Sequence, residues 1–96
     1  SPDGNYVYVA ALYSGAMVII DVTDKNAPVK LGHVAGAANM LDGAISVAVS
    51  PDGNYVYVAA STSDAMVAID VTIPATPTIA GVISAGELYI EQSTEV

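Results

Sequence analysis

Cysteine, tryptophan and phenylalanine are absent from this 96-residue sequence, and only two of its residues are basic. Without cysteine the chain forms neither disulfides nor thiolate metal sites. Ten acidic residues give a net charge of −8, which opposes binding to nucleic acid or to an anionic membrane surface. No uninterrupted apolar run of about 18 residues occurs, so we expect no membrane insertion, and no signal peptide is recognisable. Six tyrosines must supply all the aromatic packing.

The sequence contains an internal repeat, in which residue 1 corresponds to residue 50. Ser-Pro-Asp-Gly-Asn-Tyr-Val-Tyr-Val-Ala-Ala occupies 1–11 and again 50–60, and the ungapped match extends to 21–23 and 70–72. A fixed period of this length is typical of solenoids, propellers and repeat arrays, whose units cannot bury their apolar surface alone. The sequence begins inside a repeat, so we expect a fragment or a processed product of a longer protein.

Short apolar runs separated by Gly, Pro, Asp and Asn predict an all-β fold. The expected strands are 5–11, 16–22 and 29–34, followed by 44–49, 54–60, 65–71 and 78–83. A further strand is expected in 86–93, where Leu88 and Ile90 match Ile45 and Val47. With four strands A to D in each unit, the order is BCD-ABCD-A.

Apolar side chains on both faces of 54–60 indicate a sheet that is covered on both sides. A blade of a β-propeller is such a sheet, and the repeat length fits four-stranded antiparallel blades. The sequence therefore predicts two propeller blades, completed by oligomerisation or by a larger propeller. We divide the single domain into repeat 1 (1–43), repeat 2 (44–85) and a terminal strand (86–96).

The recurring residues resemble two related propeller repeats. Ser-Pro-Asp-Gly-Asn-Tyr-Val-Tyr-Val-Ala-Ala, with Met-Val-Ala-Ile-Asp at 66–70, is similar to the YVTN-type β-propeller repeat. Met-Val-Ile-Ile-Asp-Val-Thr at 17–23, with Asn-Ala-Pro at 26–28, resembles the LVIVD repeat. The resemblance implies secreted or cell-surface proteins of archaea and bacteria, in a superfamily that also includes lactonase-like and amine-dehydrogenase-like enzymes. The chain departs from the YVTN pattern at its Ala-Ala pairs, where that family often has Thr-Asn or Ala-Asn, and two blades carry over no closed active site.

Few residues suggest catalysis or metal binding. His33 is the single histidine, and we interpret it as a partly exposed strand residue, because metal binding needs several convergent ligands. The sequence has no Gly-x-Ser-x-Gly motif to support a Ser-His-Asp hydrolase. The Asp3-Gly4 and Asp52-Gly53 pairs lack the alternating acids of a calcium loop and fit hairpin turns instead. We therefore expect no cofactor and no metal.

The connection 35–43 is the segment least explained by plain structure, because the second repeat has no equivalent of it. Binding in repeat proteins usually occurs at loops on one face. In a propeller this connection shares a face with the turns 12–15 and 61–64. The candidate ligand-binding residues are Tyr13, Asn39, Met40 and Asp42. The alternative is a small-residue loop that only spans two blades.

These observations favour a non-enzymatic propeller module, a structural or protein-interaction scaffold that is extracellular or at the cell surface. The alternative is a fragment of a lactonase-like or dehydrogenase-like propeller enzyme whose catalytic residues lie in other blades. The strand 44–49, expected nearest the propeller axis, is nearly apolar, which favours the scaffold. We also expect a homo-oligomer, in which 86–96 pairs with the first sheet of the next copy by strand exchange. A protein or small molecule could occupy the loop face.

Overall fold

The computed structural model describes residues 1–35 and 41–83, and these form seven β-strands. The strands are β1 (Tyr6–Ala11), β2 (Ala16–Asp21), β3 (Val29–Ala35), β4 (Ala44–Val49), β5 (Tyr55–Ala60), β6 (Ala65–Asp70) and β7 (Thr78–Ile83). Each lies within one residue of its expected bounds, which confirms the all-β prediction. The strand expected in 86–93 lies outside the described residues. Across the described part of the chain, no helix has the length and apolar character needed to cross a membrane.

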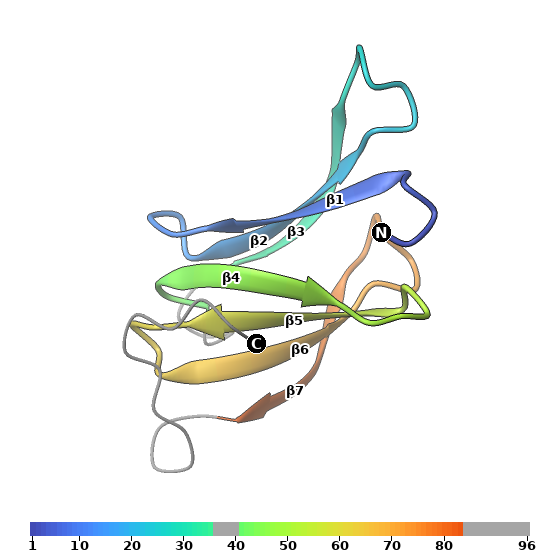
Figure 1. The fold of residues 1–96 in the computed structure, drawn as a ribbon. Coiled ribbons are helices and arrows are strands. Elements are labelled where there is room, and N and C mark those ends of the chain that lie inside the picture. The colour runs from blue at the N-terminus through green and yellow to red at the C-terminus, as the bar shows by residue number, and fades with distance from the viewer. Residues whose placement is uncertain (36–40, 84–96) are drawn as a thin grey trace.

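The strands form two antiparallel sheets that pack face to face (Figure 1). The first sheet has the order β1-β2-β3 and the second the order β4-β5-β6-β7, so each strand pairs only with its neighbours in sequence. Strands β1 and β4 lie close together where the two sheets meet. The first sheet therefore corresponds to B, C and D of one blade, and the second to A, B, C and D of the next. Within the described residues, β1 is an edge strand.

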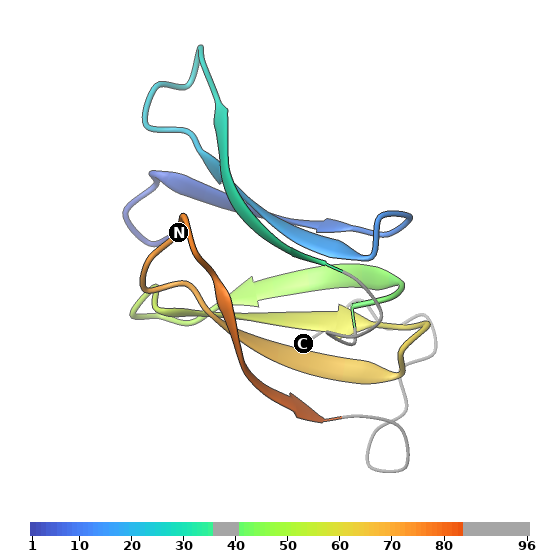
Figure 2. The same ribbon diagram turned by 180° about the vertical axis from the view of Figure 1, so that it is seen from behind.

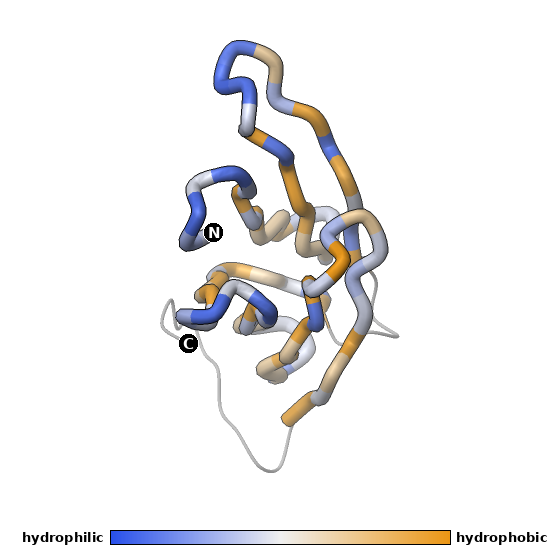
Figure 3. Tube along the Cα trace, turned by 90° about the vertical axis from the view of Figure 1, so that its right-hand side faces the viewer, coloured by the Kyte–Doolittle hydropathy of each residue, from blue (hydrophilic) through white to orange (hydrophobic). Residues whose placement is uncertain are grey.

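The core lies between the two sheets and is almost wholly apolar. Residues opposite each other in an antiparallel pair point to the same side of the sheet. Tyr8 pairs with Ile19 in the first sheet, and Val56 pairs with Ile69 in the second. All four are buried, Tyr8 nearly and the other three fully. Hydrophobic segments occur in the strands of both sheets, whereas the turns are mostly hydrophilic (Figure 3).

Each sheet also has a second face, directed away from the core. In the first sheet this face carries Val7 and Val9, which are 44% and 40% exposed. In the second sheet it carries Tyr55, which is 38% exposed, and Tyr57, which is half-buried. The sequence predicts that all four strand tyrosines, Tyr6, Tyr8, Tyr55 and Tyr57, pack between blades. Within one chain Tyr6 and Tyr8 face the second sheet, whereas Tyr55 and Tyr57 lie on the outward face of that sheet, where only another blade could cover them.

The outer strands curve across the neighbouring sheet (Figure 2). Register shifts between Ile19 and Ile20, and between Ala68 and Ile69, place a β-bulge at the same point of both repeats. Bulges bend a strand and increase its twist. The curvature brings the loop 71–77 of the second repeat against β3 of the first. A Cβ atom added to Gly32 would lie 2.8 Å from the Pro74 carbonyl oxygen, so only glycine fits there without a shift of the backbone.

Candidate functional site

The predicted recognition residues lie at the end of the sheets where the turns 12–15 and 61–64 emerge. Tyr13 is fully exposed at the tip of its turn, while Asp42 is half-buried between the two turns. Asn39 and Met40 lie outside the described residues. The structure thus places Tyr13 and Asp42 at one end of the molecule, but with different surroundings.

The described part of this connection is built into the packing. Leu41 is fully buried in the core. The Asp42 backbone N–H donates to Ser63 Oγ, and the Ser63 backbone N–H donates to the Asp42 carbonyl oxygen, each at 3.0 Å. Ser61 donates its backbone N–H to the Gly43 carbonyl oxygen at 2.9 Å. Residues 41–43 are therefore a structural joint onto the turn 61–64, and of the described candidates only Tyr13 projects freely.

Gly43 is essential to this joint. Its φ is +74°, in the left-handed region that favours glycine. A Cβ atom at this position would also collide with Thr62. The sequence therefore needs glycine here for both conformation and space.

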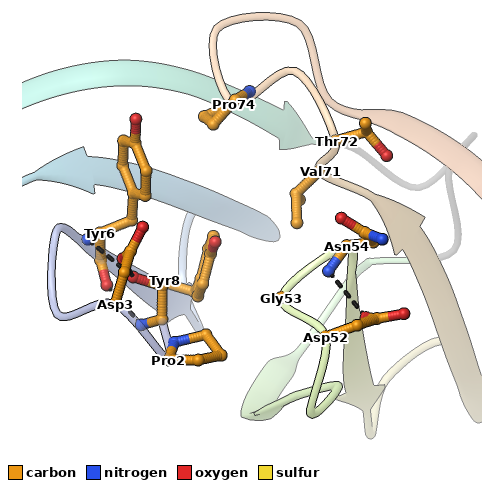
Figure 4. A pocket seen from close by; sticks show the side chains of 11 residues that line it. Pro2, Asp3, Tyr6, Tyr8, Asp52, Gly53, Asn54, Val71, Thr72 and Pro74 are labelled. Carbon is orange, nitrogen blue, oxygen red and sulfur yellow. Dashed lines mark hydrogen bonds between the residues drawn. The ribbon is translucent and has the colours of Figure 1, made fainter.

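At the opposite end of the sheets, a pocket of about 300 Å³ separates the two Ser-Pro-Asp-Gly-Asn turns (Figure 4). Its lining is Ser1, Pro2, Asp3, Tyr6, Tyr8, Asp52, Gly53, Asn54, Val71, Thr72 and Pro74. Residues of the first turn and β1 form one wall, and residues of the second turn and the end of β6 form the other. The pocket thus lies between the two repeats and uses their matching turns. We name it the inter-repeat pocket.

The two turns have the same hydrogen bonds. In the second turn, the Gly53 backbone N–H donates to the Ser50 carbonyl oxygen at 2.9 Å, and Asp52 Oδ1 accepts from Ser50 Oγ at 2.6 Å and from the Asn54 backbone N–H at 3.0 Å. In the first turn, Asp3 Oδ1 accepts from Ser1 Oγ at 2.6 Å and from the Asn5 backbone N–H at 2.9 Å. The aspartates therefore stabilise their own turns, as the turn chemistry predicts.

The inter-repeat pocket is acidic. The hydrogen bond from the Ser1 side chain, followed by that from the Asn5 backbone, lowers the pKa of Asp3. Ser50 and then Asn54 lower the pKa of Asp52 in the same way. Burial, and then the negative charge of Asp3, raise the pKa of Tyr8, so its hydroxyl stays protonated at neutral pH. At that pH the pocket combines two carboxylates with a phenol donor, which suits a cationic group.

Sequence reasoning missed this pocket, because each turn is fully explained as a hairpin connection. The signal that points to it is the repetition of the turn, since adjacent repeats place equivalent turns side by side. His33 is exposed on β3. Over the described ranges, no group of three or more His, Cys, Asp or Glu side chains is arranged to hold a metal ion.

Comparison with known proteins identifies the family. The LVIVD repeat model matches residues 3–35 and 43–84, and the chain therefore belongs to the LVIVD repeat family. No curated protein shows significant similarity to it.

Two solved structures share the fold. A functionally unknown protein from Desulfotomaculum acetoxidans DSM 771 has a TM-score of 0.76 and 22% identity, with 95% of this chain and 27% of that chain covered. A candidate 6-phosphogluconolactonase from Bacteroides fragilis NCTC 9343 has a TM-score of 0.72 and 20% identity, with 92% of this chain and 25% of that one covered. The chain thus spans about a quarter of each neighbour, and the propeller-like fold predicted from the repeat is confirmed.

Proposed function

We propose that this chain is a non-enzymatic propeller repeat module, which acts outside the cell as a structural or protein-interaction scaffold. The observation that carries the proposal is that the recurring aspartates form hydrogen bonds within their own turns. Asp3 and Asp52 each bind their own turn, and Asp21 and Asp70 each accept the backbone N–H two residues later, at 2.8 Å. These four carboxylates are used to stabilise turns, and we assign none of them a role as a catalytic nucleophile or a general base.

The surface supports an interaction role. Tyr13 exposes its whole side chain at one end, and the inter-repeat pocket presents two carboxylates at the other. Tyrosine is enriched at protein interfaces, and carboxylates recognise Lys or Arg side chains. A protein that carries basic residues therefore fits the pocket end better than an anionic ligand does.

The alternative proposal is part of a lactonase-like enzyme whose catalytic residues lie outside this chain. An enzyme assay of the longer protein that we expect to contain this chain separates the two. That protein should not accelerate the hydrolysis of 6-phosphogluconolactone above the uncatalysed rate. Saturable turnover by that protein would contradict the scaffold role.

The location is tested on the source cells. A scaffold outside the cell should be digested by protease added to intact cells, while an internal control protein survives. Protection from protease until the cells are lysed would contradict the extracellular location.

A further inference from the structure

The outward face of the first sheet repeats the inward face of the second, residue for residue. The inward face of β5 and β6 is formed by Val56, Val58, Ala60, Ala65, Val67 and Ile69. The equivalent residues on the outward face of β1 and β2 are Val7, Val9, Ala11, Ala16, Val18 and Ile20, and the residue type is the same at all six positions. We call this outward surface the valine face.

The outward face of the second sheet repeats the other half of the core. Tyr55, Tyr57, Ala59, Met66 and Ala68 stand where the first sheet has Tyr6, Tyr8, Ala10, Met17 and Ile19. The only change among these five is Ala68 for Ile19. We call this outward surface the tyrosine face. The outward faces thus repeat the residue pattern that β1, β2, β5 and β6 contribute to the internal interface, with Val7, Val9 and Tyr55 exposed.

Equivalent valine and methionine residues differ in burial according to whether a sheet faces them. Val56 and Val58 are fully buried against the first sheet, whereas Val7 and Val9 are exposed. Met17 is likewise fully buried, and its equivalent Met66 is half-buried. The outer strand is less similar, since Lys30 takes the position of Ile79, where its aliphatic stem can still pack and its amine reach solvent.

Gly81 gives an independent reason for a partner on the tyrosine face. Its equivalent, Gly32, is required because the loop 71–77 approaches within 3.0 Å of where a Cβ atom would be. A Cβ atom at Gly81 would meet nothing within 4 Å. Glycine in a strand is costly and often marks the close approach of another backbone. The loop equivalent to 71–77 is 22–28, which a second copy would bring to this point.

Charge adds complementarity at the same contact. If the tyrosine face of one copy met the valine face of another, the turns 50–54 and 1–5 would form a second inter-repeat pocket. Ten of its eleven lining positions would keep the residue type of the internal pocket. The exception is Pro74, whose equivalent is the exposed Lys25. The junction would therefore place a lysine next to Asp52 of one copy and Asp3 of the other.

We propose that copies of this chain associate head to tail, with the tyrosine face of one copy packed on the valine face of the next. The contact reproduces the internal interface and lets Gly81 receive the loop 22–28 of the second copy. It differs from strand exchange by 86–96, because the sheets meet through their side chains. The inference rests on the proposed scaffold role and adds a second copy of the chain as the partner at the sheet faces, separate from a basic partner at the inter-repeat pocket.

Two variants test the direction of assembly by light scattering. Val9→Lys blocks the valine face and Tyr57→Glu blocks the tyrosine face, and each change should weaken association by about thirtyfold or more, as for a central interface residue. The wild type should exceed the monomer mass of 9.7 kDa, while each variant alone stays at that mass. An equimolar mixture of the two should form a dimer and nothing larger, because each variant keeps the face that the other lacks.

Controls keep this test decisive. Ile73→Lys alters a residue that is exposed outside both faces and should assemble like the wild type. If either variant fails to fold by circular dichroism, Val7→Lys and Tyr55→Glu replace the pair at more exposed positions. A wild type that stays monomeric, an oligomer that persists in Val9→Lys, or a mixture that stays monomeric would each overturn the proposal.

Gly81 and Lys25 give further readouts. Gly81→Val should leave the thermal unfolding of the monomer unchanged and abolish association, whereas Gly32→Val should prevent native folding. Lys25→Glu should raise the dissociation constant about tenfold by placing a third carboxylate at the junction. Unimpaired association of Gly81→Val would overturn the contact. Lactone turnover would count against the scaffold role without affecting these results, so the two proposals fail separately.

Discussion

Asp42 and Ser63 exchange two hydrogen bonds, in which the backbone of Asp42 is used for both and the side chain of Ser63 for one. Ser63→Ala should therefore destabilise the fold by about 1 kcal/mol, because the Asp42 N–H loses its acceptor. Asp42→Ser should stay within about 0.5 kcal/mol, since the backbone bonds remain. Urea unfolding measures both. A larger loss for Asp42→Ser would show that its carboxylate, and not its backbone, carries the joint.

The tyrosines of the two repeats should respond differently to truncation. Tyr8→Ala removes an aromatic ring from the core and should cost about 3–5 kcal/mol. Tyr55→Ala should cost about 1 kcal/mol or less in a Val9→Lys background, where the chain is expected to be monomeric and Tyr55 remains exposed. Urea unfolding of both variants in that background makes the comparison. If both variants lost the same free energy of unfolding, Tyr55 would have to be buried in the monomer, contrary to its exposure in the structure.

The aspartates of the turns predict a decline of stability in acid. Hydrogen bonds, from Ser side chains for Asp3 and Asp52 and from Thr side chains for Asp21 and Asp70, lower the pKa of each carboxyl in the folded state. Their contribution is present above the unfolded value of about 3.9 and is lost as the pH falls through the lower folded values.

Thermal unfolding between pH 6 and pH 2 checks this decline. Asp52→Asn keeps an acceptor oxygen but cannot ionise, so its Tm should fall below that of the wild type at pH 6 and converge with it near pH 2. A constant difference between the two over this range would rule out the ionised carboxylate as the cause.

The terminal strand expected in 86–93 makes a separate prediction for assembly. Its pairing with the edge of β1 in a neighbouring copy would complete a four-stranded blade by main-chain hydrogen bonds. If this pairing, and not the packing of the tyrosine face on the valine face, holds the copies together, removal of 86–96 should abolish the oligomer while the two sheets keep their circular dichroism signal. An unchanged mass for the truncated chain would leave face-to-face packing as the sufficient contact and exclude strand exchange.

The strand bounds could be predicted closely because the same strand and turn residues occur in both repeats, with Pro-Asp-Gly before β1 and again, at 51–53, before β5. The alternation of Tyr and Val in β5 also indicated a sheet covered on both faces. It could not indicate which face is covered inside one chain. Tyr8 and Tyr57 are identical in local sequence, and only the order of the sheets leaves one buried and the other half-exposed.

The candidate sites could be predicted less well, because both depend on contacts between the repeats. The connection 35–43 was singled out as an insertion, but the burial of Leu41 and the pairing of Asp42 with Ser63 depend on how the sheets pack. The inter-repeat pocket needs the turns 1–5 and 50–54 side by side. The sequence of either turn alone does not indicate that the two turns lie next to each other.

The meander order of both sheets has a consequence for how quickly the chain folds. Every strand pairs with its neighbour in sequence, so each hairpin closes a short loop and little chain entropy is lost before its contacts form. Chains dominated by such local pairings fold faster than β-sandwiches with distant pairings. The slower event should be the docking of the two sheets, and a kinetic experiment should find mutations at Val56 or Tyr8 acting on that step rather than on hairpin closure.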